Sequence, residues 1–572
     1  MPINNLQTKR RCTYRHSIFL FLKYFVLMKK LLFLLLATAM ASCAPEKLPA
    51  DLLIKNATIY TVDKDFNSAN ALVAKDGKIL EIGLKPELEL KYNIKQTYDA
   101  KGNTVVPGLI DAHAHLYGLG LGLQNVDLIG TTSLEEILGR VVAFQEEKNM
   151  PYIIGRGWDQ NDWEDKNFPT KKELDSLFPE TPVALQRVDG HAYLVNSKAL
   201  ELAGITAKTK VAGGEVVLEN GEPTGIIIDA PMRLIRKTFP EITAEVSAEA
   251  LLEAEKICLQ YGLTTVDDAG LDKNIIELID TLQKQGKFKL RMYAMVSNSP
   301  KNRDYYLNKG IYKTERLNVR SFKVYSDGAL GSRGAALREP YSDMPHHFGA
   351  MITPPDSLAY LAEKFAASKF QMNTHAIGDS ANIAVLRAYK KALEGQTDRR
   401  WRVEHAQIMP PEGFDYFTEN HNILPSVQPT HATSDMYWAE DRVGADRIKG
   451  AYANETLLQH SGVIALGTDF PVEHVNPMYT FYAAVARKDL KNYPEKGFQM
   501  KDALSREEAL KGMTIWAAFA NFEEDEKGSI EVGKFADFTI LDKDIMKVEE
   551  AELPKTKVVA TFINGELVYE AQ

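Results

Sequence analysis

Two histidines close together in the chain, His113 and His115, could share one metal ion. They follow the apolar run 105–111, which has the composition of a β-strand. Residues two apart on a strand project from the same face, about 7 Å from each other, so both imidazoles can converge on one cation. His-x-His alone is weak evidence for a metal site. Its strength here comes from the other candidate ligands.

Each of these other candidates lies at or near the end of a further predicted strand. The C-terminal ends of the strands are where barrel enzymes build their active sites. Histidines together with a carboxylate suit zinc or a similar first-row ion. We therefore predict a metal site at one end of a barrel, made by His113, His115, Lys323, His375, His405 and Asp469.

Lys323 is the unusual member of this set. An ammonium group that points into a cationic cluster would be strongly disfavoured, so the side chain must be neutral or chemically converted. The structural alternative is a barrel lysine that pairs with an acid such as Asp327.

The elements that must position these residues alternate between short apolar runs and helical stretches. This alternation implies parallel strands with helical crossovers, and eight such units close a barrel. We predict an α/β fold with a TIM (β/α)8 barrel over residues 105–526. Its strands are expected at residues 105–111, 263–267, 290–296, 321–325, 370–374, 401–404, 423–428 and 463–467.

The chain departs from this pattern in two places. The gap at residues 117–262 is too long for one crossover and predicts a large insertion after the first strand. Its segments Gly-Arg-Gly-Trp-Asp-Gln (155–160) and Arg-Val-Asp-Gly-His (187–191) look like functional loops. Short alternating runs with Asp-Gly and Lys-Gly turns occur at residues 50–104 and again at 527–572. These predict antiparallel pieces that join as one small β-sandwich domain.

Residues 1–42 have the character of a leader peptide. They carry seven basic residues and no acidic one. From Met28, the expected true start, Met-Lys-Lys precedes an apolar run and then small residues up to Cys43, which is the pattern of a secretory signal. The apolar run is too short to span a bilayer. Cys43 resembles the lipidated cysteine of a bacterial lipobox, although Met40 replaces the usual leucine, so a plain periplasmic protein is the alternative.

We therefore expect an exported bacterial protein, a lipoprotein anchored in the membrane and facing the periplasm or the cell surface. The formal charge of −9 becomes −16 without the leader. An acidic surface argues against nucleic acid and against a basic membrane-binding face, so contact with the membrane is expected only through a lipid anchor at Cys43. Cys258 is the only other cysteine after the leader, which excludes an intramolecular disulfide framework. The expected partner is a small-molecule substrate, and self-association is left open.

These motifs resemble the amidohydrolase superfamily. The resemblance rests on Pro-Gly-Leu-Ile-Asp-Ala-His-Ala-His (107–115), the lysine on the fourth strand, the histidines on the fifth and sixth, and the aspartate on the eighth. Residues 528–538 are similar to the superfamily's C-terminal signature. More narrowly, residues 327–335, Gly-Trp-Asp-Gln and Asp-Gly-His (189–191) resemble the branch that contains the N-substituted formamide deformylases and YtcJ-like proteins, the amidohydrolase 3 type.

The resemblance implies that Lys323 is carboxylated and that its carbamate bridges two divalent metal ions, with zinc expected. His113 and His115 would hold one ion with Asp469, and His375 and His405 would hold the other. The carbamate removes the electrostatic objection to Lys323. Two such ions lower the pKa of a bridging water and polarise a substrate carbonyl. Asp469 would take the water's proton and deliver it to the leaving nitrogen. A single-metal variant stays open.

Substrate contacts are expected outside the metal ligands. Arg333 could bind a carboxylate or orient a carbonyl. The alternative is a structural role, in which Arg333 forms a salt bridge within its loop. His191, in the insertion, could donate a hydrogen bond to a developing oxyanion, and His431 is a similar candidate.

The leading functional hypothesis is hydrolysis of an amide-type C–N bond, such as that of an N-acyl or N-formyl amine. The second is deamination or opening of a cyclic amide on the same metal framework. The third, of a different class, is a lipoprotein that binds small molecules or proteins without turnover. The complete ligand set argues against this third hypothesis.

Overall fold

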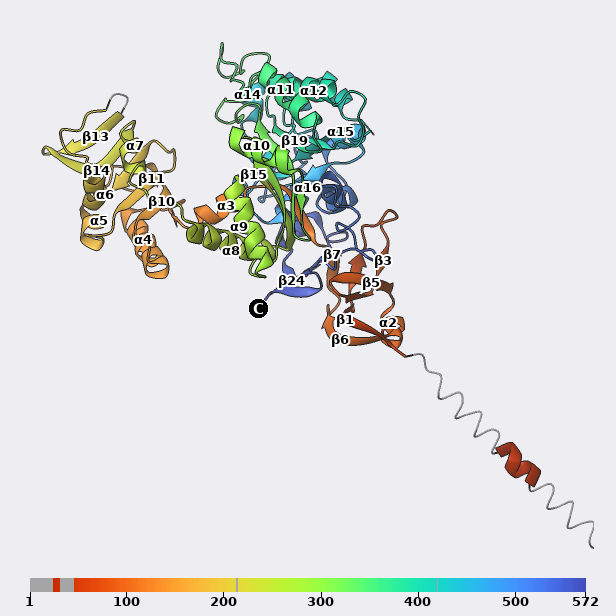
Figure 1. The fold of residues 1–572 in the computed structure, drawn as a ribbon. Coiled ribbons are helices and arrows are strands. Elements are labelled where there is room, and N and C mark those ends of the chain that lie inside the picture. The colour runs from red at the N-terminus through yellow and green to blue at the C-terminus, as the bar shows by residue number, and fades with distance from the viewer. Residues whose placement is uncertain (1–23, 31–45, 212–213, 419) are drawn as a thin grey trace, which may run out of the picture.

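The computed structural model describes residues 24–30, 46–211, 214–418 and 420–572. Those from residue 46 onward form a barrel, a β-sandwich and an insertion domain (Figure 1). Residues 24–30 are helical. The predicted cleavage region and Cys43 lie outside the described residues. Within the described ranges, no helix combines the length and the apolar character needed to cross a membrane.

The central barrel has eight parallel strands, which confirms the predicted α/β barrel fold. Each strand pairs with the next one in sequence, and the chain after the last strand returns to the first. There the amide of Asp469 donates to the carbonyl of His113 at 2.7 Å, and the amide of His115 donates to the carbonyl of Phe470 at 2.8 Å. In order, the strands are β8 (Leu109–Ala114), β15 (Leu263–Leu271), β16 (Arg291–Ser297), β18 (Leu317–Tyr325), β19 (Gln371–His375), β20 (Trp401–Glu404), β21 (Ile423–Val427) and β22 (Ala465–Leu466).

The first predicted strand, residues 105–111, is in fact two strands. Residues 104–107 form β7 (Thr104–Pro107), which belongs to a sheet of the sandwich, and the barrel strand β8 begins at Leu109. The chain passes from one sheet to the other at Gly108. A Cβ atom there would lie 2.2 Å from the Thr264 hydroxyl on β15, so only glycine fits. Because residues 105–111 are apolar almost throughout, their composition gives no sign of this change of sheet.

Helices cover the outside of the barrel because each presents one apolar face to the strands. The helix α8 (Ala244–Gln260) begins where the Thr243 side chain accepts a hydrogen bond from the Val246 amide. Its residues Leu251, Ala254 and Cys258, spaced three and four apart, are buried. The helices α9 (Lys273–Lys284), α11 (Pro355–Ala366) and α12 (Asp379–Ala392) bury apolar faces in the same way.

The sandwich combines strands from both ends of the chain. One sheet has the order β5-β4-β1-β6 and the other the order β25-β24-β23-β7-β2-β3. Both are mixed, because β1 pairs with β6 and β2 with β7 in parallel, so the expectation of antiparallel pieces is wrong for these pairs. The strands are β1 (Leu48–Lys55), β2 (Thr58–Tyr60), β3 (Ser68–Ala69), β4 (Ala71–Lys75), β5 (Lys78–Gly83), β6 (Tyr92–Asp99), β23 (Phe538–Leu541), β24 (Val558–Ile563) and β25 (Glu566–Glu570).

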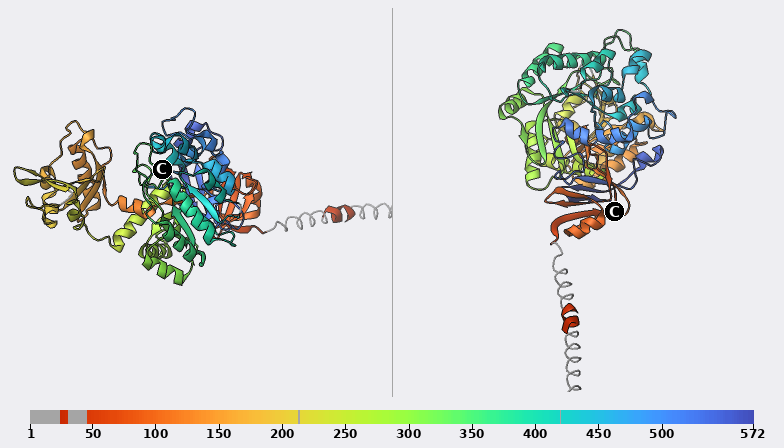
Figure 2. Two further views of the ribbon diagram at one scale, coloured as in Figure 1. Left: turned by 90° about the horizontal axis from the view of Figure 1, so that it is seen from above. Right: turned by 90° about the vertical axis from the view of Figure 1, so that its right-hand side faces the viewer.

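The insertion domain occupies a narrower range than residues 117–262. At its borders, the helix α3 (Leu116–Gly122) packs closely on α8, since a Cβ on Gly120 would lie 2.1 Å from the Ala250 carbonyl oxygen. Both helices therefore belong with the barrel. The domain itself has one sheet, β13-β14-β12-β11-β10-β9, and stands apart from the barrel in Figure 1 and in the left view of Figure 2. Its strands are β9 (Val126–Asp127), β10 (Ile153–Trp158), β11 (Val183–Arg187), β12 (Ala192–Val195), β13 (Gly214–Glu219) and β14 (Glu222–Asp229).

Candidate metal centre

Three of the predicted ligands meet inside the C-terminal end of the barrel. His113 on β8, His405 after β20 and Asp469 after β22 each offer one ligand atom, and these atoms lie within 4.8 Å of one another. All three residues are buried. His405 and Asp469 have positive φ angles of 72° and 62°, a conformation that costs a non-glycine residue about 1–3 kcal/mol and is concentrated at functional sites.

Two contacts fix the imidazole rings of this cluster. The Nδ1 atom of His113 lies 2.6 Å from the Oε2 atom of Glu404, and the Nδ1 atom of His405 lies 2.6 Å from the Oε1 atom of Gln428. With Nδ1 engaged in each ring, Nε2 carries the lone pair for a metal. Histidines that bind metals are held by such a partner on the other nitrogen, which sets both the tautomer and the ring orientation.

Burial keeps these imidazoles neutral near neutral pH. Desolvation, followed by the nearby Lys323, lowers the pKa of His113 to about 4 and that of His375 to about 3. Burial also lowers the pKa of His405 well below its usual range. A neutral imidazole is the form that coordinates a metal.

His115, His375 and His431 surround the three central ligands. The Nε2 atom of His115 lies 3.2 Å from Oδ1 of Asp469, and the Nε2 atom of His431 lies 3.7 Å from Oδ2. The His375 and His405 ring centroids are 4.6 Å apart.

Several polar atoms of this cluster are buried and make no hydrogen bond within the described protein: Nε2 of His375, Nε2 of His431 and Oδ1 of Asp469. Buried polar groups normally have partners. Nitrogen and carboxylate atoms that converge without partners fit a divalent metal ion.

Lys323 lies against the histidine cluster, in contact with His113. Its Nζ atom is 3.0 Å from Nε2 of His113 and is fully enclosed. Burial lowers its pKa to about 8, against the opposing effect of Glu404 and Asp469. The alternative partner Asp327 is engaged elsewhere, because its carboxylate accepts from the amides of Ala336, Ile377 and Gly378. The structural explanation of Lys323 as the partner of Asp327 is therefore wrong.

Glu404 is a functional candidate that the sequence reasoning missed. Neighbouring residues on a strand face opposite sides, so Glu404 should point away from the site if His405 points into it. The positive φ of His405 breaks this alternation and lets both side chains enter the barrel. Beneath Glu404, Arg402 is buried and bonds to Asp267 at 2.9 Å and to the Ala112 carbonyl at 2.8 Å.

Of the three predicted substrate contacts, His431 lies beside the cluster, and Arg333 and His191 lie outside it. Arg333 forms a two-point ion pair with Asp343, at 2.7 and 3.1 Å, on the loop after β18. His191 lies in the insertion domain, exposed, with its Nδ1 atom 2.7 Å from Oδ1 of Asp229. The roles of all three toward a substrate stay predictions.

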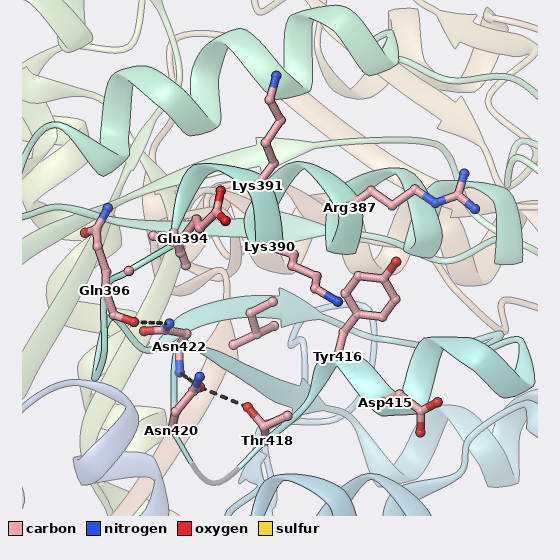
Figure 3. Close-up of a pocket in the computed structure, with 13 residues that line it drawn as sticks. Arg387, Lys390, Lys391, Glu394, Gln396, Asp415, Tyr416, Thr418, Asn420 and Asn422 are labelled. Atoms are coloured by element: carbon pink, nitrogen blue, oxygen red, sulfur yellow. Dashed lines mark hydrogen bonds between the residues drawn. The ribbon is translucent and has the colours of Figure 1, made fainter.

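A separate pocket of about 570 Å³ lies between α12 and the start of β21, on the face of the barrel opposite the metal centre (Figure 3). Its walls mix the cations Arg387 and Lys390 with the acids Glu394 and Asp415. Asn422 donates to the Gln396 carbonyl at 2.7 Å, so this amide is already used by the protein. We assign no ligand to this pocket.

Comparison with known proteins decides the family. The model of the amidohydrolase family Amidohydro_3 matches residues 96–569. The chain belongs to the amidohydrolase family.

The sequence similarity to known relatives extends over nearly the whole length of this amidohydrolase. It is 34% identical to the Arabidopsis thaliana protein LONG AFTER FAR-RED 3, with 92% of each chain covered. It is also 34% identical to YtcJ of Bacillus subtilis, over 90% of this chain and 98% of YtcJ. The N-substituted formamide deformylase of Arthrobacter pascens is 27% identical, over 91% of this chain and 98% of the deformylase.

A solved structure with the same fold is an uncharacterized metal-dependent hydrolase from Pyrococcus furiosus. Its TM-score is 0.72 at 28% identity, and the match covers 87% of this chain and 100% of that one. The fold, the family and the buried donor set together identify the protein as a metal-dependent amidohydrolase.

Proposed function

We propose that this amidohydrolase cleaves an amide-type C–N bond, in an N-acyl or N-formyl amine. The observation that carries the proposal is the convergence of His113, His405 and Asp469, whose ligand atoms lie within 4.8 Å of one another in a buried site. The similarity to an N-substituted formamide deformylase over most of both chains supports the substrate class.

Asp469 is the proposed general base and acid. Despite its burial, the flanking histidines lower its pKa well below the usual range, so the carboxylate is ionised and can accept a proton from the attacking water. Its buried Oδ1 atom has no hydrogen-bond partner in the described structure. The same carboxylate would pass the proton to the leaving nitrogen, and the amine and the carboxylate products would then separate.

The cofactor proposal is zinc, as two ions bridged by a carboxylated Lys323. His113, His115 and Asp469 would hold one ion, and His375 and His405 the other. A bound divalent ion supplies the electrophile that polarises the substrate carbonyl and lowers the pKa of a coordinated water. The enclosure of the Lys323 Nζ atom among neutral imidazoles supports a neutral amine there, which is the form that reacts with carbon dioxide.

The test is a substrate panel on the zinc-loaded protein. N-substituted formamides, N-acetyl amines, a hydantoin and adenosine should be compared by the products they release. We expect carboxylate and substituted amine from the first two classes. Release of ammonia from adenosine alone would favour a deaminase, and no turnover of any compound by protein with full metal content would contradict hydrolysis of this class.

We further propose export and a lipid anchor at Cys43. The support is the sequence pattern of residues 28–43. Metabolic labelling with a palmitate analogue should mark the wild-type protein and not Cys43→Ser. Equal labelling of the two, or none in either, would contradict the anchor.

A further inference from the structure

Two segments that the metal site does not use meet at one edge of the insertion sheet. Residues 155–158 are the last part of the strand β10, and residues 159–160 follow it. Arg187 is the last residue of β11, the parallel neighbour of β10, and residues 188–191 follow it. Arg187 ties the segments together, because its guanidinium bonds to Asp159 at 2.7 Å and to Gln160 at 3.0 Å. The carboxyl ends of parallel strands thus form a fixed polar rim, as they do in α/β ligand-binding sites.

This rim carries an exposed histidine–carboxylate pair. The side chain of His191 is 72% exposed, although its Nδ1 atom lies 2.7 Å from Asp229 at the end of β14. Nε2 is then the ring nitrogen left for a partner outside the domain. Two apolar residues on the loops that follow the neighbouring strands are also exposed, Ile129 at 66% and Val188 at 41%. An edge that carries both a polar histidine–carboxylate pair and exposed apolar side chains is suited to binding.

The mouth of the barrel exposes apolar side chains beside the metal site. Tyr325 is 42% exposed, and its ring centroid lies 5.6 Å from that of His375. Val472 is 68% exposed, and its amide donates to the Asp469 carbonyl. Ile352, on the loop after β18, is 63% exposed. These side chains border the ligands, so a cover over them would also exclude water from the reaction.

The insertion domain is a separately packed body. It has two apolar cores of its own, formed around residues such as Leu185 and Val195. Only the linkers 123–125 and 237–243 join it to the barrel. Of the described residues, Lys148 alone makes ion pairs or hydrogen bonds from the body of the domain (126–236) to the barrel, with Glu249 and Glu253 on α8. This contact lies beside the linkers, and the body of the domain stands away from the barrel in Figure 1 and in the left view of Figure 2.

We propose that the insertion domain closes over the barrel mouth, so that the rim of residues 129, 159–160 and 187–191 covers the metal site and His191 contacts the substrate. This inference rests on the proposed hydrolysis. The hydrogen bond to Asp229 raises the pKa of His191 and so favours the imidazolium, whose Nε2 can donate. Closure would remove water from the site and bring this donor to the carbonyl oxygen as its charge develops. Closure would also explain how His191, which lies on a separate domain, reaches a substrate at the metal site.

Cysteine cross-linking tests closure without any substrate. In the zinc-loaded full-length chain, Ile129→Cys and Val188→Cys are each combined with Val472→Cys and oxidised, and linked peptides are identified by mass spectrometry. The control pair joins Leu202→Cys to Val472→Cys. Leu202 is exposed at the end of the helix α6 (Ser197–Leu202), which follows the end of β12 that lies away from the rim. We expect at least one rim pair to link several-fold faster than the control. No difference between the rim pairs and the control would overturn closure.

Kinetics test the contact with the substrate. On the formamide or acetamide that the wild type hydrolyses fastest, His191→Ala should lower kcat/KM on the order of 100-fold, the effect of losing one oxyanion donor. Zinc content should not change. Leu202→Ala, exposed on the same domain, should keep full activity. Unchanged kinetics in His191→Ala would overturn this role while leaving the hydrolysis itself intact. If the wild type hydrolyses nothing, the proposed function fails and cross-linking still decides closure.

Discussion

The Nδ1 atom of His113 lies 2.6 Å from the Glu404 carboxylate, and both side chains are fully buried. This contact joins the first barrel strand to the sixth and aims the other nitrogen of His113 at the metal site. Glu404 is therefore a positioning residue, which acts through His113.

Glu404→Gln should weaken zinc binding about 10–100-fold, the usual effect of changing such a partner. The amide can still accept a hydrogen bond, but it lacks the charge that strengthens the imidazole as a ligand. Competition with a chromogenic chelator measures the affinity. Glu255→Gln is the matched control, since Glu255 is also buried but accepts from the Lys289 and Leu290 amides instead. An equal loss of zinc affinity in both variants would contradict the positioning role.

Lys323→Arg should reduce the metal content per chain, because a guanidinium cannot form the carbamate that would bridge two ions. Metal analysis after reconstitution with excess zinc and bicarbonate measures this. In the wild type, labelled bicarbonate should give a carbamate carbon signal that Lys323→Arg lacks. A variant that keeps the metal content of the wild type would rule out the bridge.

Gly467→Ala should destabilise the barrel at its junction. A Cβ atom at Gly467 would lie 2.5 Å from the His113 amide nitrogen and 2.8 Å from Oδ1 of Asp111. Overpacking of this kind typically costs about 1–3 kcal/mol in free energy of unfolding. Because the clash adjoins His113, zinc affinity should fall as well.

Urea unfolding measures the stability of Gly467→Ala. The control is Gly139→Ala in the helix α4 (Leu134–Lys148), where no atom lies within 4 Å of the added Cβ. That change should raise the stability by about 0.5–1 kcal/mol, since alanine favours a helix over glycine. Equal stability of the two variants would show that the junction tolerates the added methyl group.

Arg402→Met should lower the free energy of unfolding by about 3–5 kcal/mol, because it leaves Asp267 buried without its cation. Both side chains of this pair are fully buried, and the pair lies directly beneath the metal site. The double variant Arg402→Met/Asp267→Leu should recover part of the loss. A double variant less stable than Arg402→Met would mean that the cost does not come from the unpaired carboxylate.

The sequence alone was enough to predict the barrel and the three residues that meet in its candidate metal centre. Strand composition and helical crossovers repeat along the chain, so local patterns located seven of the eight barrel strands and part of the first. They placed His113, His375, His405 and Asp469 at or near strand ends. These predictions depend on local periodicity, which each segment carries by itself. The prediction failed at residues 105–111, where one apolar run serves two different sheets.

Tertiary structure decided what depends on segments far apart in sequence. The pairing of Glu404 with His113 could not be predicted, because strand alternation places Glu404 on the wrong face and only the positive φ of His405 reverses this. The junction between Gly467 and His113 likewise exists only once the barrel closes. The separation of His191 from the metal site is also set by how the domains are arranged, which no local pattern encodes. The sequence thus determined which residues can bind a metal, and the fold determined which atoms orient them.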